Sequence, residues 1–305
     1  MDFENRLSSV TMSYADLHTH SIFSDGLDSP EQLIERAQEM GFAAMALTDH
    51  DTTEGLEDFC RAGEQAGIMT ICGIEISAYF NDQPVHILGY GIDRLHPGLN
   101  QEMLSMQQIR NERNERMRKR FGALGIPILA EELFSSGRGQ VGRPHFARLL
   151  VAKEVVGSEE EAFARFLKKN GAAYVAKEKY PAAKAISSIR QAGGVAVLAH
   201  PWCTNGSLTS LPALINRMVD IGLQGIEVYY PAHPPAVQQK LLQLAEKLQI
   251  LITGGSDYHG GERALAREKG DVPSYLLPGR LLSPLERAMA MSRRQDLPFV
   301  KETRR

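Results

Sequence analysis

Cysteine is scarce in this 305-residue sequence, and the three cysteines stand far apart. Cys60, Cys72 and Cys203 form no CxxC pair, so they offer neither the spacing of a thiolate metal site nor the dense pairing of a disulfide-stabilised domain. A small, odd set of distant thiols is typical of proteins from a reducing compartment. We therefore expect a cytoplasmic protein without a disulfide framework.

Long apolar segments and an excess of positive charge are also lacking. No uninterrupted apolar run approaches the roughly 20 residues of a membrane span, and the N-terminus lacks a secretory pattern. Lys and Arg number 34 against 37 Asp and Glu, giving a formal charge of −3. This balance argues against a protein that coats nucleic acid through bulk electrostatics. We expect no membrane attachment, and we infer no obligate protein partner.

Short apolar runs alternate with longer amphipathic stretches, which is the pattern of βα units and a largely parallel sheet. The chain length suits one α/β barrel with an insertion. Polar residues close each candidate strand at its C-terminal end. The candidate strands end within 16–18, 44–48, 71–75, 85–89, 194–199, 225–229 and 251–254.

The segment from 96 to 181 differs, because it contains several helix-like stretches with glycine breaks and no convincing strand. We predict an inserted small helical subdomain at 96–181 and a discontinuous barrel formed by 13–95 and 182–300. The run 110–120 mixes charge signs at helical spacing, which favours a solvent-exposed face. Contact of this arginine-rich run with RNA is the alternative.

Histidine is concentrated where the strands end, and this is the strongest functional signal. In Asp16-Leu17-His18-Thr19-His20 the period of a strand puts both imidazoles on one face, a metal-ligand spacing. Asp257 and His259 repeat this spacing after the last strand. Six of the nine histidines lie at or just beyond predicted strand ends: His18, His20, His50, His86, His200 and His259.

Three carboxylates complete the candidate ligand set. Glu75 interrupts the apolar run 71–76, and a charge inside a buried strand is costly unless a cation neutralises it. Asp25 lies in a loop five residues after His20, and Asp257 precedes His259. Oxygen and imidazole ligands without thiolate suit Mn, Zn or Fe better than Ca or Mg. Nine ligands exceed the need of one ion, so we expect two or three divalent ions, with manganese preferred and zinc or iron as alternatives.

The segments DLHTHS, TDHD, GIEIS, AHP and SDYH match motifs of the PHP family, named for polymerase and histidinol phosphatase, and the chain resembles this family over nearly its whole length. The resemblance implies an irregular (β/α)7 barrel with a trinuclear centre. His145 is an alternative to His86 as a ligand. The implied ligands are His18, His20, Glu75 and Asp257 for one ion, Glu75, His86 and His200 for the second, and Asp25, His50 and His259 for the third.

Within the family, the insertion and the segment Gly142-Arg143-Pro144-His145-Phe146 are similar to those of TrpH-type phosphoesterases. The resemblance implies hydrolysis of nucleoside 3′,5′-bisphosphates, and of the 5′-phosphorylated ends of short RNA, by attack of a metal-bridging hydroxide. Two readings stay open beside it. One is a histidinol-phosphate phosphatase, which needs the same metal chemistry, and the other is a non-catalytic metal-binding module.

Substrate contacts are expected from three residues outside the metal set. Arg143 can hold a phosphate through two parallel hydrogen bonds, although an exposed, salt-bridged arginine is the alternative. His145 offers a second donor, and His233 follows another strand end. For the reaction itself we expect Asp257, His200 and Arg143 to act as the catalytic residues.

Overall fold

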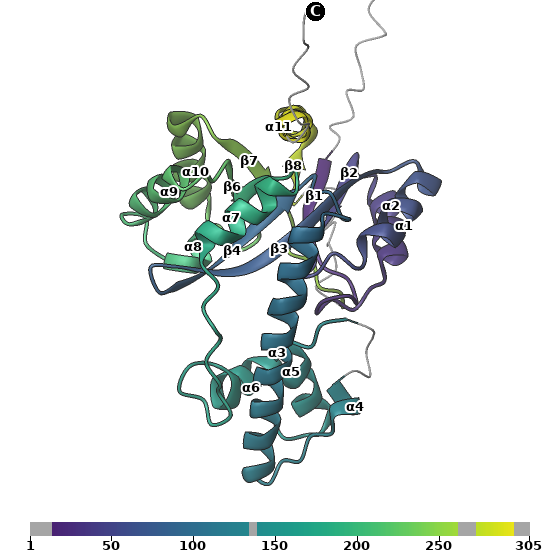
Figure 1. Cartoon of the computed structure of the whole chain (residues 1–305), viewed down its shortest axis with the longest axis vertical. Coiled ribbons are helices and arrows are strands. Elements are labelled where there is room, and N and C mark those ends of the chain that lie inside the picture. Colours follow the sequence, from purple (N-terminus) through teal and green to yellow (C-terminus); the bar gives the residue numbers. More distant parts are fainter. Residues whose placement is uncertain (1–13, 134–138, 262–272, 296–305) are drawn as a thin grey trace, which may run out of the picture.

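The computed structural model describes residues 14–133, 139–261 and 273–295, in which strands and helices alternate along most of the chain (Figure 1). The strands are β1 (Tyr14–Thr19), β2 (Ala44–Leu47), β3 (Met69–Phe80), β4 (Gln83–Tyr90), β5 (Val195–Leu198), β6 (Gly225–Tyr229), β7 (Leu251–Gly254) and β8 (Leu277–Pro278). The helices are α1 (Pro30–Met40), α2 (Leu56–Ala66), α3 (Pro97–Ala123), α4 (Ala130–Leu133), α5 (Arg143–Ala152), α6 (Glu159–Ala162), the π-helix η1 (Phe163–Leu167), α7 (Ala182–Gln191), α8 (Pro201–Asn205), α9 (Leu211–Asp220), α10 (Pro235–Leu248), the 3₁₀ helix η2 (Gly279–Leu281) and α11 (Leu282–Gln295).

The strands form one sheet in the order β7-β6-β5-β4-β3-β2-β1-β8 that curls until its ends nearly meet. Closure comes from the segment after β7, where Tyr258 lies beside Thr19 at the end of β1. The backbone N–H of His20 donates to the carbonyl of Tyr258 at 2.8 Å. The predicted α/β barrel is confirmed, and its seven candidate strands correspond to β1 to β7.

The direction of β4 departs from the expected parallel arrangement. β4 runs antiparallel to both β3 and β5, whereas β1 to β3 and β5 to β7 are parallel neighbours. His86 is therefore the fourth residue of its strand and does not close it, which corrects the expectation from the sequence. Because the first half of an antiparallel strand lies at the edge where its neighbours end, His86 still reaches the same mouth of the barrel.

The first βα connection illustrates why these residues fold as they do. Ser29 caps α1 by accepting from the backbone N–H of Gln32, and Pro30 occupies the first helical position. The side chain of Gln32 accepts in turn from the N–H of Ser29, which completes a capping box. Gly41 ends the helix at a φ of 66°, a conformation that glycine adopts without strain.

Two apolar clusters hold the barrel together. Inside it, Leu17, Leu88 and Val197 are fully buried in one cluster. The second cluster fills the space between the sheet and its surrounding helices, and it includes Ile76 and Ile189. Because both faces of the strands are covered, a charged side chain within a strand is removed from water on either side.

The chain between β4 and α7 builds a helical body with its own core. α3 extends away from the barrel, and α4, α5 and α6 lie around its far part (Figure 1). The ring of Phe121 stacks on Phe146 with centroids 5.8 Å apart and also contacts Phe166 at 5.6 Å. The predicted domain bounds, 13–95 with 182–300 and 96–181, stay a prediction, and residues 13, 134–138, 262–272 and 296–300 lie outside the described part of the chain.

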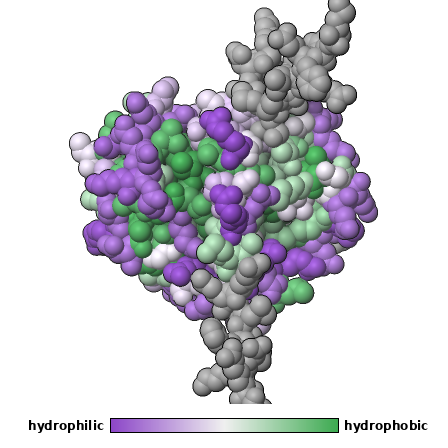
Figure 2. All heavy atoms as spheres, turned by 90° about the horizontal axis from the view of Figure 1, so that it is seen from above, coloured by the Kyte–Doolittle hydropathy of each residue, from purple (hydrophilic) through white to green (hydrophobic). Residues whose placement is uncertain are grey.

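The face seen in Figure 2 carries hydrophilic side chains over much of its area, with hydrophobic side chains gathered between them. Among the helices of the described ranges, none combines the length and the apolar character that crossing a bilayer requires.

Candidate metal centre

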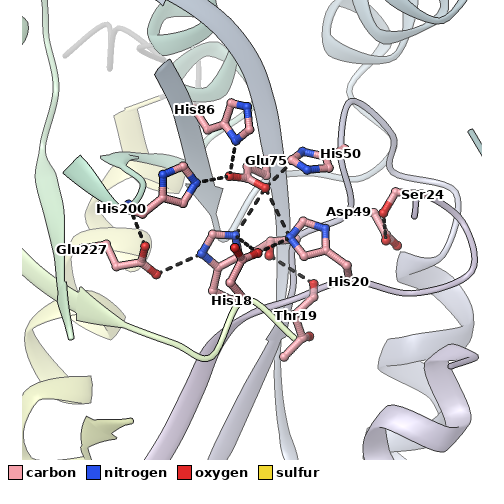
Figure 3. Close-up of polar contacts among 12 residues, drawn as sticks. His18, Thr19, His20, Ser24, Asp49, His50, Glu75, His86, His200 and Glu227 are labelled. Atoms are coloured by element: carbon pink, nitrogen blue, oxygen red, sulfur yellow. Dashed lines mark hydrogen bonds and ion pairs between the residues drawn. The ribbon is translucent and has the colours of Figure 1, made fainter. Parts of the chain in front are cut away.

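One mouth of the barrel gathers polar side chains from most of its strands (Figure 3). Parallel strands end at this mouth, and antiparallel β4 begins there, so residues far apart in the sequence meet. The structure brings together all nine residues that the sequence predicts as metal ligands. They are His18 in β1, His20 directly after β1, Asp25 of the following loop, His50 after β2, Glu75 of β3, His86 of β4, His200 after β5, and Asp257 and His259 after β7.

Glu75 lies at the centre of this cluster and is fully buried. Its two carboxylate oxygens point to opposite groups of imidazoles, as Figure 3 shows. A carboxylate placed in this way can bridge two cations. Oε2 lies 3.3 Å from His18 Nε2, 3.2 Å from His20 Nε2 and 3.0 Å from His50 Nδ1, while Oε1 lies 2.8 Å from His86 Nδ1 and 3.1 Å from His200 Nε2.

The other two carboxylates extend the cluster on either side of Glu75. Asp257 Oδ1 lies 3.3 Å from His18 Nε2 and 3.1 Å from His20 Nε2. Asp25 Oδ1 lies 3.2 Å from His259 Nε2. Three groups result in which all potential ligand atoms are within 4.8 Å of one another: His18, His20, Glu75 and Asp257; His20, Asp25, His50 and His259; and His50, Glu75 and His86.

The cluster fits divalent cations better than a network of hydrogen bonds. Atoms bound at about 2.0–2.2 Å to one ion lie about 3.0–3.6 Å apart in octahedral or tetrahedral geometry. The distances of 3.0–3.3 Å around Glu75 Oε2 and Asp257 Oδ1 fall in this range. Within the described residues, His18 Nε2, His20 Nε2 and Glu75 Oε2 are buried without any hydrogen-bond partner. Such converging orphan atoms are costly unless a cation satisfies them.

Electrostatics keeps Glu75, His50 and His86 in the protonation states that metals require, whereas nearby carboxylates, against the effect of burial, raise the pKa of His18, His20, His200 and His259. Burial raises the pKa of the Glu75 carboxyl, but the neighbouring His50, His86 and His18 hold its pKa well below the ordinary value. Glu75 is therefore a carboxylate. Burial lowers the pKa of His50 well below its ordinary value and also lowers the pKa of His86, so both imidazoles are neutral and free to donate an electron pair to a metal.

The backbone is strained at two of these positions. His200 has a φ of 28° and Asp257 a φ of 53°, both in the region that favours glycine. Residues other than glycine keep such backbone angles where surrounding contacts hold them, and they are concentrated at functional sites. Gly255 contributes by lying directly against the backbone of His18, where any side chain would collide. The segment after β7 can thus approach β1 closely enough for Asp257 to face His18 and His20.

Comparison with known proteins identifies the family. A PHP domain model matches residues 16–188, more than half of the chain. The chain belongs to the PHP family. The resemblance predicted from its motifs is confirmed.

Several proteins similar in sequence to this PHP protein are named for an enzymatic activity. The 5′-3′ exoribonuclease of Haemophilus influenzae is 33% identical over 82% of this chain and 91% of its own length. The phosphoribosyl 1,2-cyclic phosphate 1,2-diphosphodiesterase of Eggerthella lenta is 35% identical, covering 80% of this chain and 94% of that protein. The 3′,5′-nucleoside bisphosphate phosphatase of Chromobacterium violaceum is 34% identical, covering 81% and 88%.

Solved structures agree with the family assignment. A protein of Bifidobacterium adolescentis assigned as a metal-dependent phosphoesterase superposes with a TM-score of 0.81 at 29% identity, covering 90% of this chain and 96% of that one. An amidohydrolase of Chromobacterium violaceum, solved with bound sulfate and no metal, also gives a TM-score of 0.81 at 32% identity, with coverage of 90% and 97%. The barrel and the helical body are thus shared with experimentally determined folds.

Sequence reasoning missed carboxylates that contact the ligand residues of the PHP centre or the serines close to these ligands in the sequence. Glu227 of β6 is fully buried and lies 2.9 Å from His18 Nδ1, while its other oxygen accepts from the backbone N–H of His200 at 2.7 Å. Asp16 accepts from the hydroxyl and N–H of Ser256, and Asp49 accepts from Ser21 and Ser24. The signal for Glu227 was available, because it interrupts an apolar strand as Glu75 does.

A cationic pocket lies beside the PHP centre, between β3, α3 and residues 177–180. Arg110 forms an ion pair with Asp51, but no carboxylate within the described ranges lies within 4.0 Å of Arg113, Arg143 or Lys177. Burial and the repulsion of neighbouring arginines lower the pKa of Arg113 to about 9 and the pKa of Lys177 well below its usual value. The exposed face expected for 110–120 is therefore wrong for Arg113, which is 4% exposed.

The predicted substrate residues take different positions. Arg143 opens α5, where its guanidinium donates to the carbonyl of Leu167 at 3.4 Å, and the salt-bridged alternative is not found in the described residues. His145 Nδ1 accepts from the N–H of Gly142, so its proton is on Nε2, and burial lowers its pKa to about 4. His233 is buried, donates from Nδ1 to the carbonyl of Val228 at 2.8 Å and packs behind Tyr230.

Proposed function

We propose that this PHP protein releases phosphate from nucleoside 3′,5′-bisphosphates, with the 5′-phosphorylated end of short RNA as a related substrate. Hydrolysis of phosphoester bonds is common to the relatives, whose names are those of a phosphatase, a phosphodiesterase and an exoribonuclease. One observation carries the choice of substrate. A pocket lined by Arg113 and Lys177, neither of which has a carboxylate partner in the described residues, lies next to a cluster of residues suited to divalent ions.

Two or three divalent ions would be held by the groups around Glu75, with manganese as the first choice and zinc or iron as alternatives. His18, His20, Glu75 and Asp257 would hold one ion, Glu75 with His86 and His200 a second, and Asp25, His50 and His259 a third. Such ions supply Lewis acidity and lower the pKa of bound water, which makes a nucleophile available at neutral pH. Glu227 would orient His18 by accepting the proton on Nδ1.

A nucleoside bisphosphate has two phosphates, and the site offers two places for anions. The carboxylate and imidazole cluster suits the phosphate that is cleaved. Arg113 and Lys177 suit the second phosphate, because their charges lack carboxylate partners in the described residues. Ser77 lines the same pocket two residues after Glu75 in β3, and Asp51 lines it next to His50, so this second region adjoins the first. Binding an anion there would reduce the repulsion between Arg113 and Lys177.

The remaining wall of the pocket suits the nucleoside. Tyr79, Tyr180, Met106 and Ile109 line it beside the cations. Aromatic and apolar side chains next to a few charged groups are typical of small-molecule sites, and tyrosine rings can stack on a base. The two tyrosines belong to neighbouring segments, since the backbone N–H of Tyr79 in β3 donates to the carbonyl of Tyr180 at 2.7 Å.

Three residues are proposed to act at the reacting phosphate. Asp257 is held in place by the hydroxyl of Tyr230, which donates to its Oδ2 at 2.9 Å, so that Oδ1 faces His18 and His20. His200 is fixed by its backbone bond to Glu227. Arg143 would bind the phosphoryl oxygens, where it opposes the charge that develops during transfer.

The two other histidines are assigned narrower roles. His145 is neutral at physiological pH because of its low pKa, so it would donate one hydrogen bond from Nε2 to a phosphate oxygen and contribute no charge. His233 stays a predicted substrate residue. Its burial favours an indirect contribution, because its ring lies 5.1 Å from that of Tyr230, which in turn positions Asp257.

The proposal is tested by phosphate release from manganese-loaded protein. Adenosine 3′,5′-bisphosphate, a 5′-phosphorylated RNA oligomer and histidinol phosphate are compared with and without chelator, and Asp257→Asn protein is the matched control. We expect chelator-sensitive turnover of the first two substrates and none by the variant. Preference for histidinol phosphate would identify a histidinol-phosphate phosphatase, and no turnover of any substrate would identify a metal-binding module.

A second candidate function follows from one relative. The Eggerthella lenta protein, 35% identical, is named as a diphosphodiesterase of a cyclic phosphoribosyl phosphate. Such a substrate holds its reacting phosphate in a ring, so hydrolysis of one ester bond opens the ring and leaves a phosphate monoester, and phosphate is released only if the second ester bond is also hydrolysed. Adding a cyclic phosphate ester of ribose to the panel separates the two activities, because ring opening is followed by chromatography and phosphate release by colorimetry.

A further inference from the structure

Two of the cysteines lie against each other on the side of the sheet that faces α2. Cys60 of α2 and Cys72 of β3 have their sulfur atoms 3.0 Å apart, and both are free thiols that are partly exposed. A disulfide has a sulfur separation of about 2.05 Å. The two sulfurs therefore need to move by only about 1 Å to be joined.

The packing of α2 on β3 explains this proximity. Gly63 lies one helical turn after Cys60, and any side chain there would overlap the side chain of Thr70. The missing side chain lets the helix approach the strand closely at this point. Thr70 and Cys72 are two residues apart in β3 and point to the same face, so the close approach at Thr70 also brings Cys60 to Cys72. Phe59, fully buried, anchors the helix beside them.

The surroundings of the pair favour an ionised thiol that small molecules can reach. Cys72 lines a pocket together with Arg94, His96 and Arg293. Hydrogen bonding from the Cys72 thiol, assisted by Arg94, lowers the pKa of Cys60 to about 6, whereas the pKa of Cys72 is raised. At neutral pH the pair thus consists of a thiolate and the thiol that donates to it, the arrangement of a reactive cysteine with a resolving partner.

The pair is separate from the metal centre. Cys72 and Glu75 are three residues apart in β3, so their side chains point to opposite faces of the sheet. None of the potential ligand groups in the described residues includes a cysteine. Cys203 is exposed, but burial of its sulfur and the charge of Asp257 raise its pKa, so it offers an internal reference for an accessible thiol that is not activated.

We propose that Cys60 and Cys72 form a peroxide-sensitive dithiol site that closes to a disulfide between α2 and β3. The Cys60 thiolate attacks one oxygen of hydrogen peroxide, the O–O bond breaks, and a sulfenic acid and hydroxide are formed. The Cys72 sulfur then attacks the sulfur of the sulfenic acid, the S–O bond breaks, and the leaving hydroxide takes up the thiol proton. Two thiols and one peroxide give one disulfide and two waters, so oxidation of sulfur balances reduction of peroxide.

The test uses full-length, manganese-loaded protein treated with limiting hydrogen peroxide, after which remaining thiols are alkylated and peptides are analysed by mass. We expect a peptide pair linking Cys60 to Cys72, lighter by two hydrogen atoms and separated by dithiothreitol, to form before Cys203 is modified. Cys203→Ser protein should form the same link. Cys60→Ser protein should leave Cys72 no more reactive than Cys203, because the attacking thiolate is gone.

Two results would overturn the proposal. One is complete alkylation of Cys60 and Cys72 after a dose of peroxide that has already modified Cys203. The other is a disulfide between Cys203 and either of the pair as the main product. Neither outcome depends on a substituted protein, since both are read from the wild-type chain.

Discussion

Glu227→Gln tests whether the buried carboxylates behind the cluster set its affinity for metal. Glu227 is fully buried and uses both oxygens, one near His18 Nδ1 at 2.9 Å and the other accepting from the N–H of His200 at 2.7 Å. Glutamine keeps the shape of the side chain and one acceptor. It removes the negative charge and places an NH₂ group against one of the two donors, so the orientation of either His18 or His200 is disturbed.

The expected effect is a loss of metal affinity with the fold retained. Removing a hydrogen-bond partner of a metal-binding histidine lowers affinity or activity by about 10–100-fold, which corresponds to about 1.4–2.8 kcal/mol. The assay is a titration of metal-free protein with manganese, followed by phosphate release from adenosine 3′,5′-bisphosphate. The manganese concentration that gives half-maximal turnover should rise by that factor, and saturating manganese should restore part of the turnover.

The matched control is Glu246→Gln, which makes the same chemical change at an exposed position of α10. Its titration should coincide with that of the wild type. An unchanged midpoint in Glu227→Gln would show that this carboxylate does not support the metal ligands, and its proposed role in orienting His18 would be refuted.

Four further outcomes are expected. Asp257→Asn should abolish turnover while unfolding stays cooperative by circular dichroism, because it removes a ligand at the barrel mouth and no core contact. Arg143→Ala should raise KM for the bisphosphate about 10–100-fold, the value of a charge-assisted hydrogen bond. Burial lowers the pKa of Lys177, so its positive charge is present below that pKa and lost above it. KM for the bisphosphate should therefore rise on the alkaline side of a pH profile. In Lys177→Arg protein this rise should move to higher pH. Phe146→Ala should destabilise the helical body by about 3–5 kcal/mol in urea unfolding, since its ring is fully buried against Phe121.

Much of the site could be predicted because barrel strands end at a common mouth. The spacing of His18 and His20 requires only that β1 be a strand, and Glu75 stands out as a charge in an apolar run. These inferences depend on local structure, which short sequence patterns determine well. The same pattern at Glu227 was passed over, although a charge in Gly225–Tyr229 raises the same question of what neutralises it.

Other features were not predicted, and most of them depend on how distant segments meet. The antiparallel direction of β4 follows from the short turn that joins it to β3, and it alone explains why His86 reaches the site from within its strand. Arg113 looks like part of a solvated helix face, yet it is buried and lines a pocket together with Lys177 and Tyr180. The positive φ angles of His200 and Asp257 likewise had no signal in the sequence.

The most direct test of a metal-dependent phosphoesterase centred on Glu75 is metal content measured together with turnover. Wild-type and Glu75→Gln proteins are loaded with manganese, desalted and analysed by mass spectrometry for metal per chain, and the same samples are assayed for phosphate release. We predict at least two ions per wild-type chain, a loss of metal in the variant because the bridging carboxylate is gone, and no turnover by the variant. Full turnover by Glu75→Gln protein, or by wild-type protein stripped of metal, would contradict the account.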